Sequence, residues 1–445
     1  MRRGRVAARA AIIVVLVALV GVIGALVSAR SASASPLIAT RAVGPDPSSV
    51  AVDTRAGRVF VVNNGDDTIT MLDARAGQAL RVISFSGAPT ALAVDERRGH
   101  LLVGVGSLTP GGHDTVATLD SRTGALLYST TVGARPDAIA LDQRAGRAYV
   151  ATFQDDSLST LDLASGRTLR TVPVGFDQTT GYAPAEVAID ARAGRVFVMN
   201  SSNNSVSMVD AATGRLRRVL PLGQAVPGDT GEPNTRLLAV DEAAGRLFVA
   251  ARTASGNSIR MLDTRTGATL HTLSVRWTPD AVLLDMRTRR VFVSNGAGPG
   301  MLLDARTGSV VRTVNVGNAT NDAVVDARTG RVYVLRETLL DGGAAVGTGS
   351  VLTLDGATGQ VVRAVPIGLL PRDLAVDART DRVFVSNAND AEFNRDGYRA
   401  RSGEGSTTWS WVPQPIRGWL SRAAPPQPAP TGPVSGTVSV IDTTR

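Results

Sequence analysis

Few side chains in this sequence have the chemistry that catalysis or metal binding requires. The 445 residues contain no cysteine and three histidines, His100, His113 and His271, which form no pair at a metal-ligand spacing. The absence of cysteine excludes disulfides, thiolate zinc sites, a cysteine nucleophile and covalent haem attachment. No P-loop or dinucleotide-binding fingerprint is present. The sequence therefore predicts no catalytic residue, no metal ligand and no cofactor.

The side chains best suited to binding lie in one long segment near the carboxyl end, residues 388–435. This segment holds three of the four tryptophans of the chain, together with arginine and tyrosine. Aromatic and arginine side chains dominate binding hot spots, and tryptophan beside arginine is also found at membrane surfaces. Three interpretations stay open: a lid, a partner or ligand site, and a membrane contact. The candidate residues are Trp409, Trp411, Trp419, Arg395 and Tyr398.

Acidic residues in the long segments form a second candidate site. Carboxylates that gather from several loops bind hard cations such as Ca²⁺, although most loop carboxylates are simply solvated. Three or more acids or histidines converging within about 5 Å would favour an enzyme, whereas an exposed aromatic patch would favour binding. The candidates are Asp229, Glu232, Asp341 and Asp390.

The first 35 residues have the composition of an export or anchoring signal. Four arginines precede an uncharged apolar run, residues 10–29, which as a helix would span about 30 Å, the thickness of a bilayer core. The flanking positive charge predicts a cytoplasmic amino terminus, and Ala32 and Ala34 form a possible signal-peptidase site. The alternatives are an uncleaved single-pass anchor and a cleaved signal peptide. Both place residues 36–445 outside the cytoplasm, at the cell membrane or secreted.

The rest of the chain is built from one repeated unit. An apolar triplet ends in Asp and is followed by a turn with Arg and Gly, a Val-Phe-Val strand, a strand ending in Leu-Asp, a second Gly turn, and a strand ending in Val-Gly. Four short strands in a period of about 40–50 residues are typical of a β-propeller blade. The first-strand aspartates recur eight times, at Asp53, Asp95, Asp142, Asp190, Asp241, Asp285, Asp326 and Asp377.

These aspartates are predicted to build turns rather than to catalyse. In the pattern D-x-R-x-G-R the carboxylate accepts backbone N–H bonds, and Gly supplies a positive φ. Arg289 and Asp381 replace this glycine in two copies, which predicts turns there that are slightly strained or differently built. The net charge of +8 comes from arginines spread over the turns. We interpret them as a solvated rim and predict no nucleic-acid binding.

Motifs such as VAIDARAGRVFVMN and VSMVDAATGRLRRVLPLG resemble the repeats of the YVTN-type (YncE-like) β-propeller family, and the resemblance covers residues 37–445. It implies an all-β fold with a single propeller, while repeats of this kind imply no particular function. Relatives often have seven blades, but eight units are present in this chain, so eight blades are predicted and seven are the alternative.

The ends of the chain are predicted to close the ring. The last unit lacks its fourth strand, and residues 37–44, LIATRAVG, end in Val-Gly as fourth strands do. They should pair with residues 437–442 and remove the exposed edges of an open array. Connections after strands two and four then share one face. The long segments all fall on it, which predicts a binding face: residues 106–114, 176–185, 224–235, 336–350 and 388–435.

The function that follows is that of an extracytoplasmic binding or scaffold protein acting through the face with the long loops. The predicted partner is an unidentified extracytoplasmic protein or a small-molecule or carbohydrate ligand, with membrane contact through the N-terminal helix. The alternative is an enzyme, because some propellers of similar build are lactonases or lyases. That alternative needs acids and a metal at the mouth of the channel.

Overall fold

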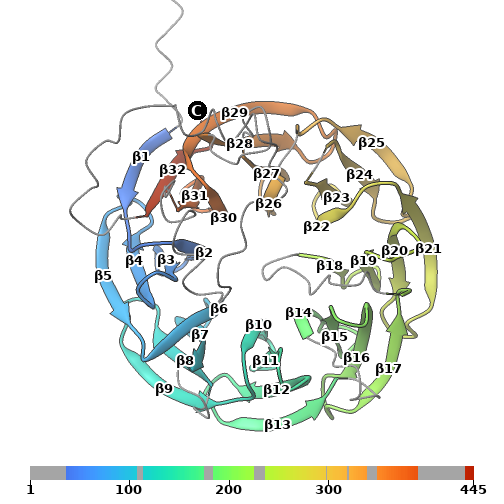
Figure 1. Cartoon of the computed structure of the whole chain (residues 1–445), viewed down its shortest axis with the longest axis horizontal. Helices are drawn as coiled ribbons and strands as arrows, with labels where there is room; N and C mark the ends of the chain where they lie inside the picture. The colour runs from blue at the N-terminus through green and yellow to red at the C-terminus, as the bar shows by residue number, and fades with distance from the viewer. Residues whose placement is uncertain are drawn as a thin grey trace, which may run out of the picture.

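The computed structural model describes residues 37–107, 114–174, 184–224, 236–296, 298–317, 320–337, 348–388 and 436–444. These residues form eight four-stranded antiparallel sheets, arranged as blades in a ring (Figure 1). The prediction of an all-β propeller with eight blades is confirmed. The predicted signal or anchor in residues 1–35 lies outside the described residues. Within the described part of the chain, no helix has the length and apolar character needed to cross a membrane.

The strands of each blade are counted from the innermost outward. The blades are numbered one to eight in the order of their innermost strands along the chain. The innermost strands are β2 (Pro47–Asp53), β6 (Gly87–Asp95), β10 (Pro136–Asp142), β14 (Pro184–Asp190), β18 (Leu238–Asp241), β22 (Pro279–Asp285), β26 (Thr320–Asp326) and β30 (Pro371–Asp377). The second strands are β3 (Arg58–Asn63), β7 (His100–Ser107), β11 (Arg147–Thr152), β15 (Arg195–Asn200), β19 (Arg246–Ala251), β23 (Arg290–Asn295), β27 (Arg331–Arg336) and β31 (Arg382–Asn387).

The outer half of each blade follows the same order. The third strands are β4 (Thr68–Asp73), β8 (Thr115–Asp120), β12 (Ser157–Asp162), β16 (Ser205–Asp210), β20 (Asn257–Asp263), β24 (Gly300–Asp304), β28 (Thr348–Asp355) and β32 (Thr437–Asp442). The outermost strands are β5 (Ala79–Ser84), β9 (Leu126–Thr131), β13 (Thr168–Pro173), β17 (Leu216–Pro221), β21 (Thr269–Val275), β25 (Val310–Val314), β29 (Val361–Leu369) and, in blade eight, β1 (Leu37–Ala42).

The core lies between neighbouring blades, and the second strand of each blade is its centre. In β3 the side chains of Val59, Phe60 and Val61 are all fully buried, because the sheets of adjacent blades cover both faces of the strand. An aromatic residue occupies the position of Phe60 in seven of the eight blades, and burying each stabilises the fold by about 1.5–3 kcal/mol. The equivalent residues are Leu102, Tyr149, Phe197, Phe248, Phe292, Tyr333 and Phe384.

The Asp–Gly turns have the predicted structure. Asp53 Oδ1 accepts the N–H of Ala56 at 2.7 Å, and its carbonyl accepts the N–H of Gly57 at 2.8 Å. Gly57 has a φ of 67°, which only glycine adopts without strain. Arg289 and Asp381, in the same position of other blades, have φ values of 53° and 54°. The prediction of strain in these two turns is therefore confirmed.

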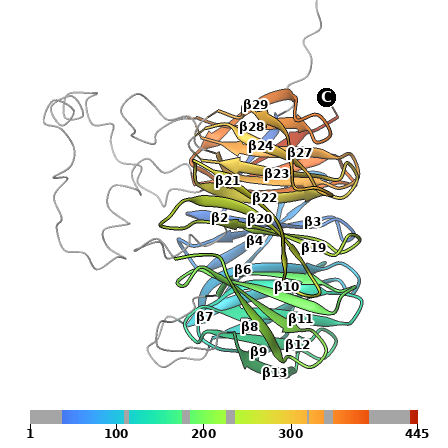
Figure 2. The same cartoon turned by 90° about the vertical axis from the view of Figure 1, so that its right-hand side faces the viewer.

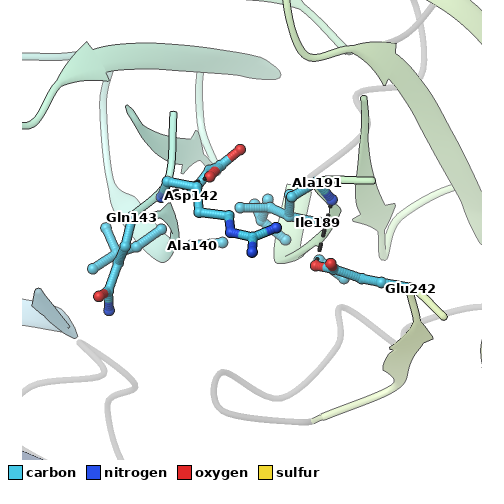
Figure 3. Close-up of a pocket in the computed structure, with 10 residues that line it drawn as sticks. Ala140, Asp142, Gln143, Ile189, Ala191 and Glu242 are labelled. Atoms are coloured by element: carbon cyan, nitrogen blue, oxygen red, sulfur yellow. Dashed lines mark hydrogen bonds between the residues drawn. The ribbon is translucent and has the colours of Figure 1, made fainter. Parts of the chain in front are cut away.

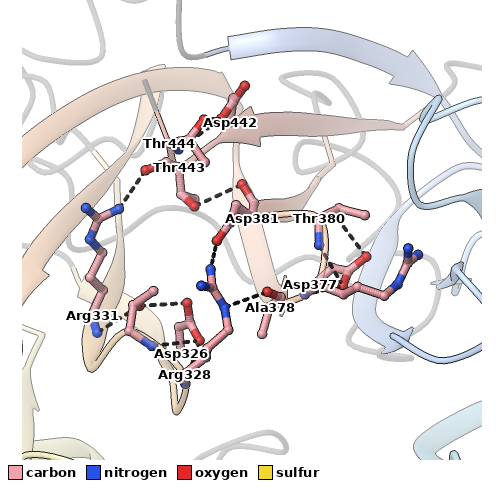
Figure 4. Close-up of polar contacts among 12 residues, drawn as sticks. Asp326, Arg328, Arg331, Asp377, Ala378, Thr380, Asp381, Asp442, Thr443 and Thr444 are labelled. Atoms are coloured by element: carbon pink, nitrogen blue, oxygen red, sulfur yellow. Dashed lines mark hydrogen bonds and ion pairs between the residues drawn. The ribbon is translucent and has the colours of Figure 1, made fainter.

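Arginines of the first turns join neighbouring blades, so the expectation of a simply solvated rim was incomplete. Arg328 in blade seven donates from Nε to the carbonyl of Ala378 in blade eight at 2.8 Å and also contacts Asp381 (Figure 4). Arg331 donates to the carbonyl of Thr443 at 2.6 Å. A guanidinium that bonds a carbonyl of the next blade satisfies a backbone acceptor at the turn.

The ring closes as predicted. β1 pairs antiparallel with β32, in a register that places Leu37 opposite Ile441 and Ala42 opposite Thr437. On the innermost turns, Arg379 Nε donates to the carbonyl of Thr54 at 2.9 Å and joins blade eight to blade one. Blade eight is thus assembled from both ends of the described chain.

The strands run between two different faces of the ring (Figure 2). We call the end that carries the connections after the first and third strands the turn face, and the opposite end the loop face. Every Asp–Gly turn lies on the turn face. Because β32 ends there at Asp442 and β1 is antiparallel to it, β1 also begins on the turn face, at Leu37.

Candidate functional site

The innermost strands surround a central channel, and at its loop-face end four charged side chains from different blades converge. We call this the mouth cluster; its members are Glu186 of β14, Arg236 before β18, Asp322 of β26 and Asp373 of β30. All four lie where the innermost strands begin, which is why residues far apart in sequence meet at one end of the channel.

Arg236 reaches the cluster because its blade is irregular. β18 has four residues, whereas the other innermost strands have seven or nine, and the chain before it lies beside blade six. There Arg236 forms a parallel bridge with Ala281 and accepts the N–H of Val282 at 2.6 Å. This position aims the guanidinium across the channel.

The guanidinium of Arg236 contacts blades seven and eight. It donates to the carbonyl of Ala323 at 2.9 Å and lies 3.5 Å from the carboxylates of both Asp322 and Asp373. The Arg236 side chain remains 36% exposed, but the two acids are only 8% and 12% exposed. Arg236 is therefore accessible from the channel while the acids are largely enclosed by protein.

The carboxylates also bond the backbone of neighbouring blades. Glu186 Oε2 accepts the N–H groups of Leu237 at 2.6 Å and Leu238 at 3.1 Å. Asp373 Oδ2 accepts the N–H of Val50 in blade one at 2.8 Å. The mouth cluster thus connects blade four, blade five, blade seven, blade eight and blade one by side-chain bonds, and it holds the irregular segment before β18 in place.

Enclosure changes the acidity of these groups. Burial raises the pKa of Glu186 to about 8, against the lowering effect of its two backbone N–H partners and Arg236. Burial also raises the pKa of Asp322 well above its usual range. The charge of Asp322, followed by those of Asp373 and Glu186, raises the pKa of Arg236. The cluster therefore combines a permanent cation with two enclosed acids, Glu186 and Asp322, whose protonated forms are favoured by burial.

A cavity of about 230 Å³ lies beside Arg236, against the innermost strands of the first four blades. Its polar walls are Ser49, Asp137, Glu186, Arg236 and Asp373. Burial raises the pKa of Asp137, which pairs with Arg135 at 3.0 Å. These groups can bond the hydroxyl or amide groups of a small ligand. Within the described residues, no three His, Asp or Glu side chains are arranged to hold a metal.

A second cavity, of about 460 Å³, opens at the turn face between blade three, blade four and blade five (Figure 3). Its polar walls are Asp142, Gln143, Arg144 and Glu242, and Ile189 is among the apolar ones. Glu242 accepts the N–H of Ala191 at 3.4 Å. Sequence analysis assigned no role to this face.

None of the candidate residues chosen from the sequence can be placed. They lie outside the described residues: Trp409, Trp411, Trp419, Arg395, Tyr398, Asp229, Glu232, Asp341 and Asp390.

The mouth cluster was not predicted from the sequence, although the repeats carry a signal for it. Glu186, Asp322 and Asp373 each stand four residues before the first-strand aspartate of their repeat. The other repeats have Ser, Ala or Leu at this position. Aligning the repeats by position, rather than searching for motifs, reveals these three acids. Only the structure places Arg236 among them.

Comparison with known proteins gives likenesses to propellers. A family model described as outer membrane protein assembly factor BamB matches residues 65–253. No curated protein sequence matches the chain. The structure resembles a computationally designed protein, Ika8, with a TM-score of 0.57 and 17% identity over 78% of this chain and 95% of that one.

Two natural proteins have similar folds. BamB from Moraxella catarrhalis has a TM-score of 0.56 and 16% identity over 79% of this chain and 97% of its own. Hydrazine synthase from Kuenenia stuttgartiensis has a TM-score of 0.51 and 15% identity over 79% of this chain and 95% of its own. At such identities the solved structures support the propeller fold alone. The matching family model is a propeller-repeat family other than the YVTN type expected from the motifs.

Proposed function

We propose that this protein is a binding or scaffold propeller that works outside the cytoplasm and takes its partner on the loop face. The supporting observation is the asymmetry of the ring. The turn-face connections are short Asp–Gly turns, whereas each long connection leaves and re-enters at the loop face. Variable loops on a rigid scaffold are the usual location of binding residues. We further propose that the repeats are of the YVTN type.

The proposed partner is a protein, with a small-molecule or carbohydrate ligand as the alternative. The matching family model supports a protein partner, because its description names an outer membrane protein assembly factor. The proposed contact residues are those of the segment 388–435, with Trp409, Trp411 and Trp419 as its anchors. The N-terminal segment, as an anchor or a cleaved signal, is proposed to place the propeller at the membrane or outside the cell.

The enzymatic alternative is not favoured by the mouth cluster. Acids do converge there, but they surround the guanidinium of Arg236, which lies 3.5 Å from two of them. A cation is therefore already present where a lactonase- or lyase-like mechanism would need a metal. The cluster bonds strands together and can bind a polar ligand at its exposed side.

Deletion of residues 391–433 tests the proposal. We expect the shortened protein to keep its thermal midpoint and circular dichroism, since the deleted residues lie between β31 and β32 and outside the described strands. The full-length protein should capture a partner from an envelope extract, which mass spectrometry identifies. The shortened protein should fail to capture it. The matched control is Trp277→Phe, because Trp277 is the one tryptophan outside the segment.

The triple variant Trp409→Ala/Trp411→Ala/Trp419→Ala refines the assignment. It should weaken capture at least tenfold if the tryptophans are hot spots, since each typically contributes more than about 2 kcal/mol. Undiminished capture by the deletion variant would refute the role of this segment.

A further inference from the structure

The turn face exposes basic side chains and conceals acidic ones. The third residue of the D-x-R pattern is an exposed arginine in seven of the eight first turns. The aspartate two residues before it is at most 9% exposed, because it is turned inward to accept backbone N–H groups. The first-turn arginines are Arg55, Arg97, Arg144, Arg192, Arg287, Arg328 and Arg379.

The same arrangement extends to the outer turns. Six of the second turns also expose an arginine, while most of their aspartates are partly buried. The exposed acids of the described turns on the turn face are few, Glu242 and Asp355. The outward-pointing charge of this face is therefore largely guanidinium. The second-turn arginines are Arg75, Arg122, Arg167, Arg215, Arg265 and Arg306.

Exposed aliphatic side chains surround this basic face. The outermost strands begin at the turn face, and their first residues include the most exposed large apolar side chains, Leu126 at 61% and Val362 at 60%. Met286, in a first turn, is 46% exposed. The second residue of the outermost strand, where Val362 lies, is apolar and exposed in seven of the eight blades. Its other occupants are Ile38, Leu80, Leu127, Leu169, Leu270 and Val311.

The N-terminal segment joins the propeller at this face. β1 begins there at Leu37, and the apolar run 10–29 precedes it by only seven residues, 30–36. An extended chain of that length reaches at most about 25 Å. An anchor in a bilayer would therefore hold the turn face, and not the loop face, close to the lipid surface.

We propose that the turn face binds the surface of an anionic bilayer, with the arginines contacting lipid phosphates and the loop face directed away. Guanidinium groups bind phosphate bidentately, and basic residues near an anionic surface add to one another. Aliphatic side chains at the rim can enter the headgroup region. The proposal rests on the proposed location outside the cytoplasm but is independent of which partner the loop face binds.

The chain contains no cysteine, so a single labelled cysteine can report which face is near the lipid. We would label Ala243→Cys, exposed in a first turn, and Gln154→Cys, exposed on the loop face. The full-length protein is reconstituted in phosphatidylcholine vesicles, with or without an equal part of phosphatidylglycerol, that carry an acceptor dye on the lipid.

With phosphatidylglycerol, energy transfer from the Ala243→Cys label should be at least twice that from the Gln154→Cys label. At about 0.5 M salt, energy transfer from the Ala243→Cys label should fall toward the value measured with phosphatidylcholine alone, because charges separated by more than a few ångströms are then screened. Transfer that does not respond to phosphatidylglycerol would mean that the tether alone orients the ring, and it would overturn the proposal.

A charge-matched pair of variants isolates the arginines. Arg144→Gln/Arg192→Gln removes two guanidiniums of the turn face that make no side-chain hydrogen bond within the described residues. Arg276→Gln/Arg372→Gln removes two exposed arginines at the loop face. The first variant should lose at least half of the phosphatidylglycerol-dependent transfer, and the second should keep it. Equal losses of this transfer in the two variants would refute lipid binding by this face. Salt-sensitive binding of the protein to DNA, without any effect of the lipid, would refute it as well.

Discussion

Glycine at the Asp–Gly turns serves two separable purposes, which two residues distinguish. Gly194 has a φ of 65°, and a Cβ added there would meet no atom within 4 Å. Gly166 has a φ of 72°, and its Cβ would lie 2.2 Å from the Tyr128 ring. The first glycine is required for backbone conformation alone. The second is required also because the outer strand of the preceding blade packs against it.

Alanine substitution should therefore affect the two positions unequally. Gly194→Ala should cost about 1 kcal/mol of stability, the strain of a left-handed residue less the lower entropy of the unfolded chain. Gly166→Ala should cost about 1–3 kcal/mol more, since Tyr128 must move. Thermal midpoints of the two variants measure the difference, and equal midpoints would contradict the packing argument.

The buried carboxyl of Glu186 predicts a pH dependence of stability. The pKa is about 8 in the folded protein and near 4.5 in the unfolded chain, so folding favours the protonated acid. Between these values the folded state binds more protons, and stability must fall as pH rises from about 4.5 to about 8. Glu186→Gln should remove this part of the decline.

Denaturation midpoints measured from pH 5 to pH 8 test this expectation. The curves of wild type and Glu186→Gln should converge or cross as the pH changes. Glu242→Gln, on the turn face, is the control and should follow the wild-type slope. If the midpoints of Glu186→Gln change with pH in parallel with those of wild type, then Glu186 is not the group that binds the extra proton in the folded state.

At the scale of strands, repetition made most of the fold predictable. The marker aspartates, the turn glycines and the closing pair of strands all follow from aligning one unit with itself, because each unit must bury its faces on its neighbours. Arg289 and Asp381 were recognisable as strained turns for the same reason. The repeat predicts the strands and turns at positions where all blades share the same residue pattern.

The candidate site was less predictable because it depends on departures from the repeat. Arg236 enters the channel because β18 is short and because Arg236 pairs with Ala281 of blade six. No local sequence pattern encodes this tertiary contact. The acids it meets come from three other blades. The tryptophans chosen from sequence remain a prediction, because they lie outside the described residues.

Contacts between blades predict a graded response to arginine substitution. Arg379 donates to the carbonyl of Thr54 across the closing junction at 2.9 Å, whereas Arg55, at the same repeat position, makes no side-chain hydrogen bond within the described residues. Arg379→Gln should lower stability by about 1 kcal/mol, and Arg55→Gln should have little effect. Chemical denaturation of both variants tests this, and a larger loss in Arg55→Gln would contradict it.

For the whole molecule, the pairing of β1 with β32 predicts a sharp boundary to truncation. A chain beginning at Leu37 keeps every described strand, whereas a chain beginning at Val43 lacks β1 and leaves β32 as an exposed edge. The longer chain should unfold at the wild-type temperature. The shorter one should unfold several degrees lower and self-associate, as light scattering would show. Identical behaviour would mean that β1 contributes nothing to closure.

The same pairing has a consequence for biosynthesis. A ribosome makes β1 before the other described strands and its partner β32 after them. Until β32 emerges, the nascent chain therefore carries a strand whose hydrogen-bonding groups lack their partner strand, and blade eight cannot form. Such a delay favours premature association between copies. The order of the strands along the chain therefore leaves β1 open to such association until β32 has been made.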